Sequence, residues 1–170
     1  MNGTLAVIFL VASLTDMGFN DCATGCLGPE QAVQRLSFQA AKVEFQEDII
    51  GNEVYVGYDV GMSYGPFQPT LGASVTDDGA YWIGAGAKWT SQGVFDSPFF
   101  IESSLMPGYF EKGDGPDLSG HLQFRSSLGL GYPFANGATI LASYDHRSNA
   151  DTQMPNPGLE TIAVRVAFPF

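Results

Sequence analysis

Charged residues are scarce in this 170-residue sequence: seven lysines and arginines and 18 acidic residues make up only 15% of the chain. An ordinary soluble domain carries about 25%. The net charge of −11 and the lack of a basic cluster exclude a nucleic-acid-binding protein, because phosphate contacts need grouped lysine and arginine. No apolar run reaches the roughly 18 residues that cross a bilayer as a helix. We therefore expect neither a nucleic-acid partner nor a helical membrane protein.

Glycine and aromatic residues are abundant instead. The chain contains 21 glycines, 13 phenylalanines, seven tyrosines and two tryptophans, and 45% of it is hydrophobic. That hydrophobic content is too high for a disordered chain. The length allows one domain, with at most a removable leader, and the composition favours an all-β fold.

The N-terminal segment has the composition of a leader. Residues 5–14 form a ten-residue apolar run, which is the length of a signal-peptide core. No lysine or arginine precedes the run, and a buried N-terminal helix is the alternative. We expect a signal peptide over residues 1–26 and a single domain over 27–170. Cys22 and Cys26 lie at the junction, where an oxidising compartment would permit a disulfide.

Alternation of apolar and polar residues indicates strands in the rest of the chain. In residues 54–64 the even positions are Val, Val, Tyr, Val, Met and Tyr, whereas the odd positions are mostly small or polar. Membrane-spanning β-strands need roughly 9–11 residues, which suits this spacing with some longer loops. The alternation and the turn residues predict eight strands: 36–47, 52–64, 66–76, 80–90, 96–109, 119–132, 136–148 and 159–170.

The polar faces of these strands separate a membrane barrel from a soluble one. A soluble barrel places apolar residues inside, whereas a small membrane barrel can pair charges inside and present apolar residues to lipid. The apolar stripe that ends at Phe170 is also typical of the last strand of bacterial outer-membrane barrels. The faces opposite the apolar ones carry charged residues: Asp59, Lys88, Glu102, Arg125 and Arg165.

We therefore predict an all-β fold, an eight-stranded antiparallel transmembrane β-barrel. Eight strands enclose a lumen that side chains fill, so no wide pore is expected. A soluble sandwich or a secreted lipocalin-like binder would show similar alternation and is the alternative.

Three polar residues occupy positions that should face lipid. His146 and Ser148 are two residues apart on one strand, so both lie on the same face roughly 7 Å apart. Glu160 begins the next strand with the parity of the apolar residues. The loop between the strands makes them antiparallel neighbours, so Glu160 can lie beside His146. A carboxylate and an imidazole on this face are costly unless they pair or take part in chemistry.

Serine, histidine and an acid together are the parts of a nucleophilic acyl-transfer site. The acid orients the imidazole, and the imidazole accepts the serine proton. The alternative is a histidine and a serine at the membrane interface without function, since His-x-Ser is a common tripeptide. His121 and His146 with scattered carboxylates lack the spacing of metal ligands, so we expect no metal and no other cofactor.

Three segments resemble a known family: HLQFRSSLGLG (residues 121–131), HRSNA (146–150) and PNPGLE (155–160). They are similar to the PagL family of outer-membrane lipid A 3-O-deacylases. The resemblance is strong over residues 119–170, and over 50–110 only the barrel-like alternation agrees.

The resemblance implies an eight-stranded barrel whose active site lies on the outer, lipid-facing surface. It assigns Ser148 as the nucleophile, His146 as the base and Glu160 as the acid that orients the base.

The resemblance also implies an oxyanion hole just after the nucleophile. The hole maps to Asn149 and to the backbone amides of Ala150 and Asp151, and Asn156 in the Asn-Pro-Gly turn would support the loop. The family commonly has glycine where this chain has Asp151. An acidic side chain beside a developing oxyanion would oppose it.

The function implied is that of a serine esterase in the bacterial outer membrane. It would remove the ester-linked 3-hydroxyacyl chain from the 3-position of lipid A in lipopolysaccharide, without a cofactor. Its partners would be lipid A and the surrounding outer-membrane lipid. A non-catalytic small outer-membrane barrel with a structural or adhesion role is the alternative.

Overall fold

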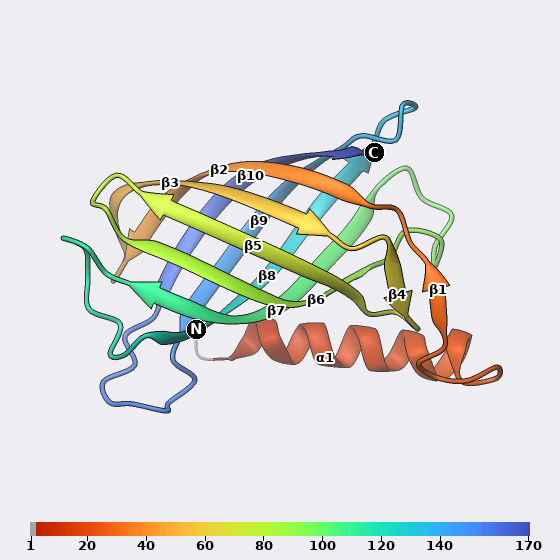
Figure 1. Ribbon diagram of the computed structural model, residues 1–170, viewed down its shortest axis with the longest axis horizontal. Coiled ribbons are helices and arrows are strands. Elements are labelled where there is room, and N and C mark those ends of the chain that lie inside the picture. Colours follow the sequence, from red (N-terminus) through yellow and green to blue (C-terminus); the bar gives the residue numbers. More distant parts are fainter. Residues whose placement is uncertain (1–2) are drawn as a thin grey trace.

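The last strand of the chain pairs with the first long one, and this pairing closes an eight-stranded antiparallel β-barrel (Figure 1). The computed structural model describes residues 3–170. The order around the barrel is β10-β2-β3-β5-β6-β7-β8-β9, which confirms the predicted fold class. The strands are β2 (Arg35–Phe45), β3 (Asp48–Asp59), β5 (Gln68–Thr76), β6 (Tyr81–Thr90), β7 (Phe100–Glu111), β8 (Leu122–Pro133), β9 (Thr139–Ser148) and β10 (Leu159–Pro169).

Each predicted strand overlaps an observed one, but the prediction for 52–64 was wrong in its last part. β3 ends at Asp59, and β4 (Met62–Tyr64) leaves the barrel to pair with β1 (Pro29–Gln31). The alternation of side chains continues through the break, so the sequence pattern does not mark it. Two glycines, Gly61 and Gly65, flank β4.

The outer wall of the barrel is apolar along the middle of the strands. Val54, Ile83, Leu130 and Ile162 are each more than half exposed, and all have the parity that the alternation assigned to lipid. These side chains would be exposed to water in a soluble protein, whereas lipid solvates them at no cost. The exposed apolar wall therefore agrees with a barrel that spans a membrane.

The interior of the barrel contains a balanced network of four acidic and four basic side chains. Arg147 pairs with Glu53 at 2.6 Å, Arg125 with Asp145 at 2.7 Å, and Arg165 with Glu102 at 2.9 Å. Lys88 bridges Glu102 and Asp59, at 3.1 Å and 2.5 Å. Buried charges are tolerated only when they are paired and hydrogen-bonded, and here each charge meets its opposite. The predicted interior positions of Asp59, Lys88, Glu102, Arg125 and Arg165 are confirmed.

One end of the barrel carries the long connections, residues 112–121 and 149–158, and is called the long-loop end below. Beneath these loops a small hydrophobic cluster closes the interior around Trp82, Phe110 and Leu118. The Trp82 ring also covers the guanidinium groups of Arg125 and Arg147, at 5.7 Å and 5.8 Å from its centroid. The cluster separates the charged interior from the loops.

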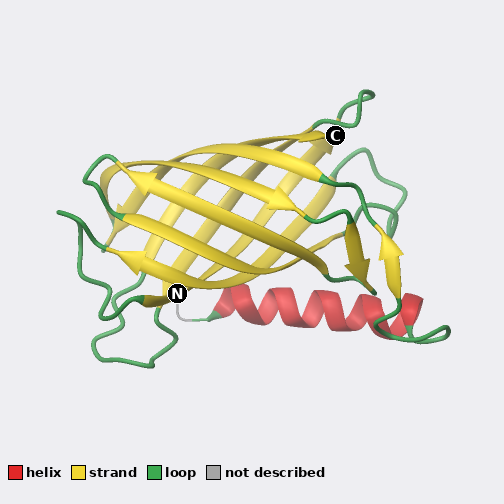
Figure 2. Cartoon of the chain, viewed as in Figure 1, coloured by secondary structure: helices red, strands yellow, loops and turns green. Residues whose placement is uncertain are grey.

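An N-terminal helix lies along the outer wall of β6, β7 and β8 (Figure 2). It comprises α1 (Thr4–Asp16), which continues as one π-helical turn, η1 (Met17–Asp21). Together they span 18 residues, Thr4–Asp21, with a mean hydropathy of 1.2. This helix is long and apolar enough to cross a membrane, and a signal sequence near the N-terminus has the same length and composition.

One side of this helix packs on the barrel. Leu5 and Phe9 are buried, and the Trp89 Nε1 donates a hydrogen bond to Asp16 Oδ2 at 2.7 Å. Just after the helix, Cys22 and Cys26 form a disulfide with their Cα atoms 3.8 Å apart.

Candidate active site

The candidate site is built on one cross-strand pair at the long-loop end. β9 and β10 are antiparallel neighbours in a register that pairs His146 with Glu160. Both residues have the parity of the outer wall, and Ser148 follows two residues later on the same face of β9. The β-sheet periodicity of two therefore brings all three predicted residues to one surface.

His146 is oriented by the carboxylate of Glu160. The Nδ1 of His146 lies 2.9 Å from Oε1 of Glu160. An ionised carboxylate can only accept, so this contact assigns the ring proton to Nδ1 and leaves the lone pair on Nε2. That nitrogen is buried and makes no hydrogen bond to any residue between 3 and 170. A neutral imidazole held in this way can accept a proton at Nε2.

His146 and Ser148 both line a small cavity of about 320 Å³. Ser148 pairs with Phe124 of β8, and His146 pairs with Ser126 of the same strand. The floor is therefore formed by two adjacent strands. The cavity is lined by Gly3, Ala6, Leu105, Phe124, Ser126, His146, Ser148, Ala150, Asp151 and Asn156.

The loop after Ser148 turns sharply around the cavity. Ala150 and Asp151 have φ angles of 53° and 60°, in the left-handed region that residues other than glycine rarely adopt. The amide of Asn156 fixes this turn: its Oδ1 accepts the backbone N–H of Asn149 at 3.1 Å, and its Nδ2 donates to Asp151 Oδ1 at 2.9 Å. The carboxylate of Asp151 is thus engaged by Asn156.

The side chain of Asn149 makes contacts different from those that the family resemblance implied. It is fully buried and is not among the residues that line the cavity. Its Nδ2 donates to backbone carbonyls of both long loops, at 3.1 Å to Leu118, 3.0 Å to Ser119 and 2.9 Å to Gln153. In this structure Asn149 ties the two loops together, whereas the two residues that follow it line the cavity.

Gly158 brings the end of the loop against the imidazole. Its φ is 75°, and a Cβ at this position would lie 2.9 Å from Cε1 of His146. Glycine is therefore required both by the backbone conformation and by the close approach. This role of Gly158 was not predicted from the sequence, although Gly158 lies two residues before Glu160 and ends an Asn-Pro-Gly turn.

Ser126 was also missed as a residue of the site. It lies directly across from His146 and lines the same cavity. The parity of β8, applied as it was to β9, would have placed it on the outer wall beside the histidine.

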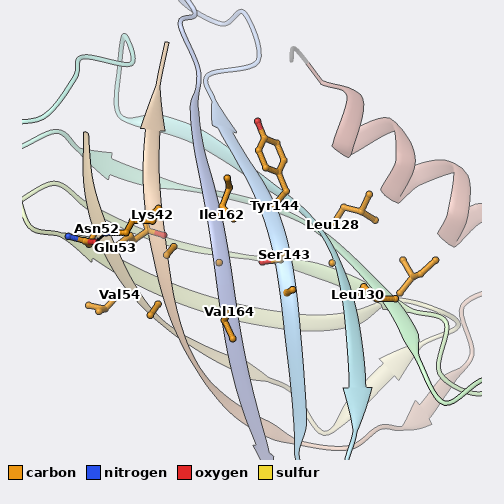
Figure 3. A pocket seen from close by; sticks show the side chains of 16 residues that line it. Lys42, Asn52, Glu53, Val54, Leu128, Leu130, Ser143, Tyr144, Ile162 and Val164 are labelled. Carbon is orange, nitrogen blue, oxygen red and sulfur yellow. Dashed lines mark hydrogen bonds between the residues drawn. The ribbon is translucent and has the colours of Figure 1, made fainter. Parts of the chain in front are cut away.

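A shallow apolar groove of about 910 Å³ lies on the outer wall (Figure 3). It begins one same-face step below the His146–Glu160 pair, where Tyr144 pairs with Ile162. Alanine and glycine form much of its floor, because Ala40, Gly129 and Ala142 lie on it. The small side chains leave a depression in the wall, and larger side chains around it, such as Leu130 and Ile162, form its sides.

The structure brings together no metal-binding cluster in its described part: among residues 3–170, no group of three His, Cys, Asp or Glu side chains could hold a metal ion.

A known protein family matches most of the chain. The family described as lipid A 3-O-deacylase (PagL) matches residues 52–169. The lipid A deacylase PagL of Bordetella bronchiseptica is 27% identical over 60% of this chain, and the match spans 61% of that relative's own length.

Two solved structures share the fold. The crystal structure of the outer membrane enzyme PagL superposes with a TM-score of 0.66 and 20% identity, over 80% of this chain and 99% of that one. Neisserial surface protein A superposes with a TM-score of 0.54 and 13% identity, over 84% and 99%.

Proposed function

Because the chain belongs to the PagL family of lipid A 3-O-deacylases, we propose that it is an outer-membrane serine esterase. Its substrate is lipid A, from which it hydrolyses the ester-linked 3-hydroxyacyl chain at the 3-position. One observation carries this proposal: on the membrane-facing wall, an imidazole oriented by a carboxylate lines the same cavity as Ser148.

The first half of the reaction transfers the acyl group to the enzyme. The Oγ of Ser148 attacks the ester carbonyl carbon while Nε2 of His146 takes the hydroxyl proton. The tetrahedral intermediate collapses when the bond to the sugar oxygen breaks, and the imidazolium gives its proton to that oxygen. The products are deacylated lipid A and an acyl-serine ester.

The second half regenerates the serine. Water loses a proton to Nε2 and attacks the acyl-serine carbonyl, and the imidazolium then protonates the departing Oγ. A 3-hydroxy fatty acid is released. Glu160 holds the imidazole in the required tautomer and stabilises the imidazolium in both halves.

The negative charge on the tetrahedral oxygen needs hydrogen-bond donors nearby. We assign this task to the backbone amides of Ala150 and Asp151, two residues that line the cavity together with Ser148. Asn156 positions these amides through its two hydrogen bonds. It also engages the Asp151 carboxylate, which limits the opposition of that carboxylate to an oxyanion.

The apolar groove below the catalytic pair is the place for acyl chains. A site at the rim of the lipid-facing wall lets the substrate stay in the membrane while only its ester enters the cavity. The groove and the cavity both include residues of β8 and β9, so a chain held by one can reach the other.

Residues 1–26 serve in this proposal as the leader that directs the chain to export, and 27–170 form the mature domain. The apolar α1, which carries a charge only at its last residue, Asp16, supports this assignment. Its removal would also take Gly3 and Ala6 away from the cavity that contains Ser148 and open that cavity to lipid. N-terminal sequencing of protein purified from the outer membrane tests the boundary.

Mass spectrometry of lipid A tests the function directly. Lipid A from cells that make the wild-type protein should lose the mass of one 3-hydroxyacyl group, and lipid A from cells that make Ser148→Ala should keep it. The variant should still fold, because Ser148 adds one hydroxyl to a cavity. Unchanged lipid A with a correctly inserted wild-type barrel would favour the non-catalytic alternative.

A further inference from the structure

The apolar groove contains one cationic side chain, and its position points to a second recognition site for the lipid. We propose that Lys42 binds a phosphate group of lipid A while the acyl chains lie along the groove. This inference rests on the proposed function and names a subsite for the charged part of the same substrate.

The distribution of basic residues makes Lys42 unusual. Four of the seven basic side chains pair with acids inside the barrel, and Arg35 has the inward parity of β2. Lys112 lies in the loop after β7, where it pairs with Asp117 at 3.5 Å. In the part of the chain that the structure describes, Lys42 is thus the one basic side chain on the outer wall of the strands.

A lysine on the lipid-facing wall costs free energy that depends on its depth in the membrane. Lys42 lies near the long-loop end, one same-face step below Glu44, which pairs with Glu160. An ammonium group there can reach the headgroup region, where the cost is small and phosphates are available. The position therefore suits a contact with a lipid headgroup rather than with the acyl chains.

The groove around Lys42 matches an amphiphile. Lys42 and Asn52 lie at one edge of the groove, while its middle is apolar, with Ile162 and Val164 (Figure 3). The hydroxyl of Tyr144 points toward the long-loop end in the same view. A molecule with a phosphate at the edge and hydrocarbon chains along the floor complements both parts.

The ammonium of Lys42 is held in place with donors to spare. Its Nζ donates to Asn52 Oδ1 at 2.6 Å. Asn52 is itself fixed by Asp77, which accepts its backbone N–H at 3.1 Å and its Nδ2 at 2.8 Å. Because an ammonium has three donors, two remain for phosphate oxygens. A pre-positioned donor loses little conformational entropy when it binds.

The register sets the spacing between this subsite and the ester. Lys42 pairs with Ile162, which pairs with Tyr144, so Lys42 lies two strands and one same-face step from His146. That separation is roughly 12 Å, a length that one or two sugar rings span. A phosphate on the glucosamine disaccharide could therefore bind Lys42 while an acyl ester of the same molecule enters the cavity.

The net charge of −11 strengthens the effect of this single cation. An anionic headgroup is repelled by most of the acidic surface, so one attractive position would determine the orientation of the lipid. Lys42 should therefore control the preference for phosphorylated over dephosphorylated lipid A and not the rate of ester hydrolysis itself.

The test compares two substrates and two matched variants. Purified protein in detergent is given lipid A with its phosphates and lipid A from which a phosphatase has removed them, and the ratio of the two kcat/KM values is measured. Lys42→Gln and Lys112→Gln remove the same charge from the same end of the barrel. Unboiled electrophoretic migration shows whether each variant has folded.

We expect wild type to favour the phosphorylated substrate by roughly ten- to a hundredfold, the size of a charge-assisted contact. Lys42→Gln should bring the ratio close to one, Lys42→Arg should retain a preference, and Lys112→Gln should behave like wild type. A wild-type ratio near one, or equal losses in the two glutamine variants, would overturn the proposal.

A failure of the proposed function would give a different result. If wild type hydrolyses neither substrate, the same comparison is made by binding, with Ser148→Ala protein and micelles of the two lipid A forms. Tighter binding of the phosphorylated form that disappears in Ser148→Ala/Lys42→Gln supports the Lys42 subsite without deacylation. Equal binding of both forms overturns it.

Discussion

At the scale of single residues, the site depends on the two nitrogens of one imidazole having different surroundings. Nδ1 of His146 is bound to Glu160 at 2.9 Å, whereas Nε2 is buried and makes no hydrogen bond to any residue between 3 and 170. A carboxylate at Nδ1 fixes both the tautomer and the orientation of the ring. The direction of proton transfer is thereby set before substrate arrives.

Replacement of Glu160 tests whether its carboxylate fixes the tautomer and orientation of His146 or only supports the local structure. In Glu160→Gln the amide can present its NH2 group to Nδ1, which favours the wrong tautomer, so kcat should fall by roughly a thousandfold or more. Glu160→Asp, with a carboxylate one methylene shorter, should lose less. Initial rates on lipid A measure both. Wild-type rates should also decline at low pH, because a protonated imidazole cannot accept the serine proton.

If Glu160→Gln and wild type had equal activities from neutral to low pH, Glu160 would have a structural role at the start of β10 and no role in orienting His146. Ser148→Ala should be the least active of the variants, since it lacks the nucleophile itself.

At the scale of elements, the catalytic loop is shaped by contacts between segments that are distant in sequence. Gly158 is the clearest case. The loop reaches β10 at this residue, and its backbone passes so close to the His146 ring that a Cβ would collide with it. Gly79 in the β5–β6 turn has nearly the same backbone angle, with φ of 80° against 75°, yet a Cβ there would meet nothing within 4 Å. The two glycines differ in surroundings rather than in conformation.

Alanine at these two positions should therefore separate strain from contact. Each substitution should destabilise the barrel by about 1 kcal/mol, because both require a left-handed backbone. Only Gly158→Ala should also displace the imidazole and lower kcat by more than tenfold. Urea unfolding gives the first quantity and lipid A turnover the second. Similar activities for Gly158→Ala and Gly79→Ala would contradict the role of the close approach.

The turn between β5 and β6 contains an acid whose titration can be followed. The backbone N–H of Asn52, more than its side chain, holds the pKa of Asp77 below its usual value. A lowered pKa means that the ionised form stabilises the folded turn above the ordinary pKa, and that this contribution is lost as the pH falls through the lowered value. The protection of the Asn52 amide, measured as its hydrogen-exchange rate relative to the intrinsic rate at the same pH, should therefore fall in strongly acidic solution, and in Asp77→Asn this change of protection with pH should disappear.

Elements also show what the sequence could and could not predict. Alternation predicted the barrel and the shared face of His146, Ser148 and Glu160, because strand periodicity is a local property that the sequence displays directly. The contacts of Asn149 were not predictable in this way. Its amide bonds to Leu118, which is 31 residues away, so its direction depends on how two loops pack. The departure of β4 from the barrel likewise depends on its pairing with β1.

At the scale of the whole molecule, the catalytic strand is anchored from the inside of the barrel. β9 alternates His146 and Ser148 on the outer wall with Asp145 and Arg147 in the interior. Asp145 accepts from Arg125 of β8 and Gln39 of β2, and Arg147 donates to Glu53 of β3. The interior network thus connects the strand that carries the site to strands on both sides of it.

The network should be stable only while its charges balance. Arg147→Met leaves four acids facing three bases, with Glu53 fully buried, and should destabilise the barrel by about 3–5 kcal/mol. Arg147→Met/Glu53→Gln restores the balance, because Arg125 keeps Asp145 as its partner, and should recover much of the loss. The temperature at which the unboiled band shifts to the unfolded position, measured in lipid vesicles, reports the stability.

Lys112→Met is the control, since its exposed pair with Asp117 should contribute at most about 1 kcal/mol. A double variant no more stable than Arg147→Met alone would show that the lost contacts of Arg147, and not the charge imbalance around Glu53, account for the destabilisation.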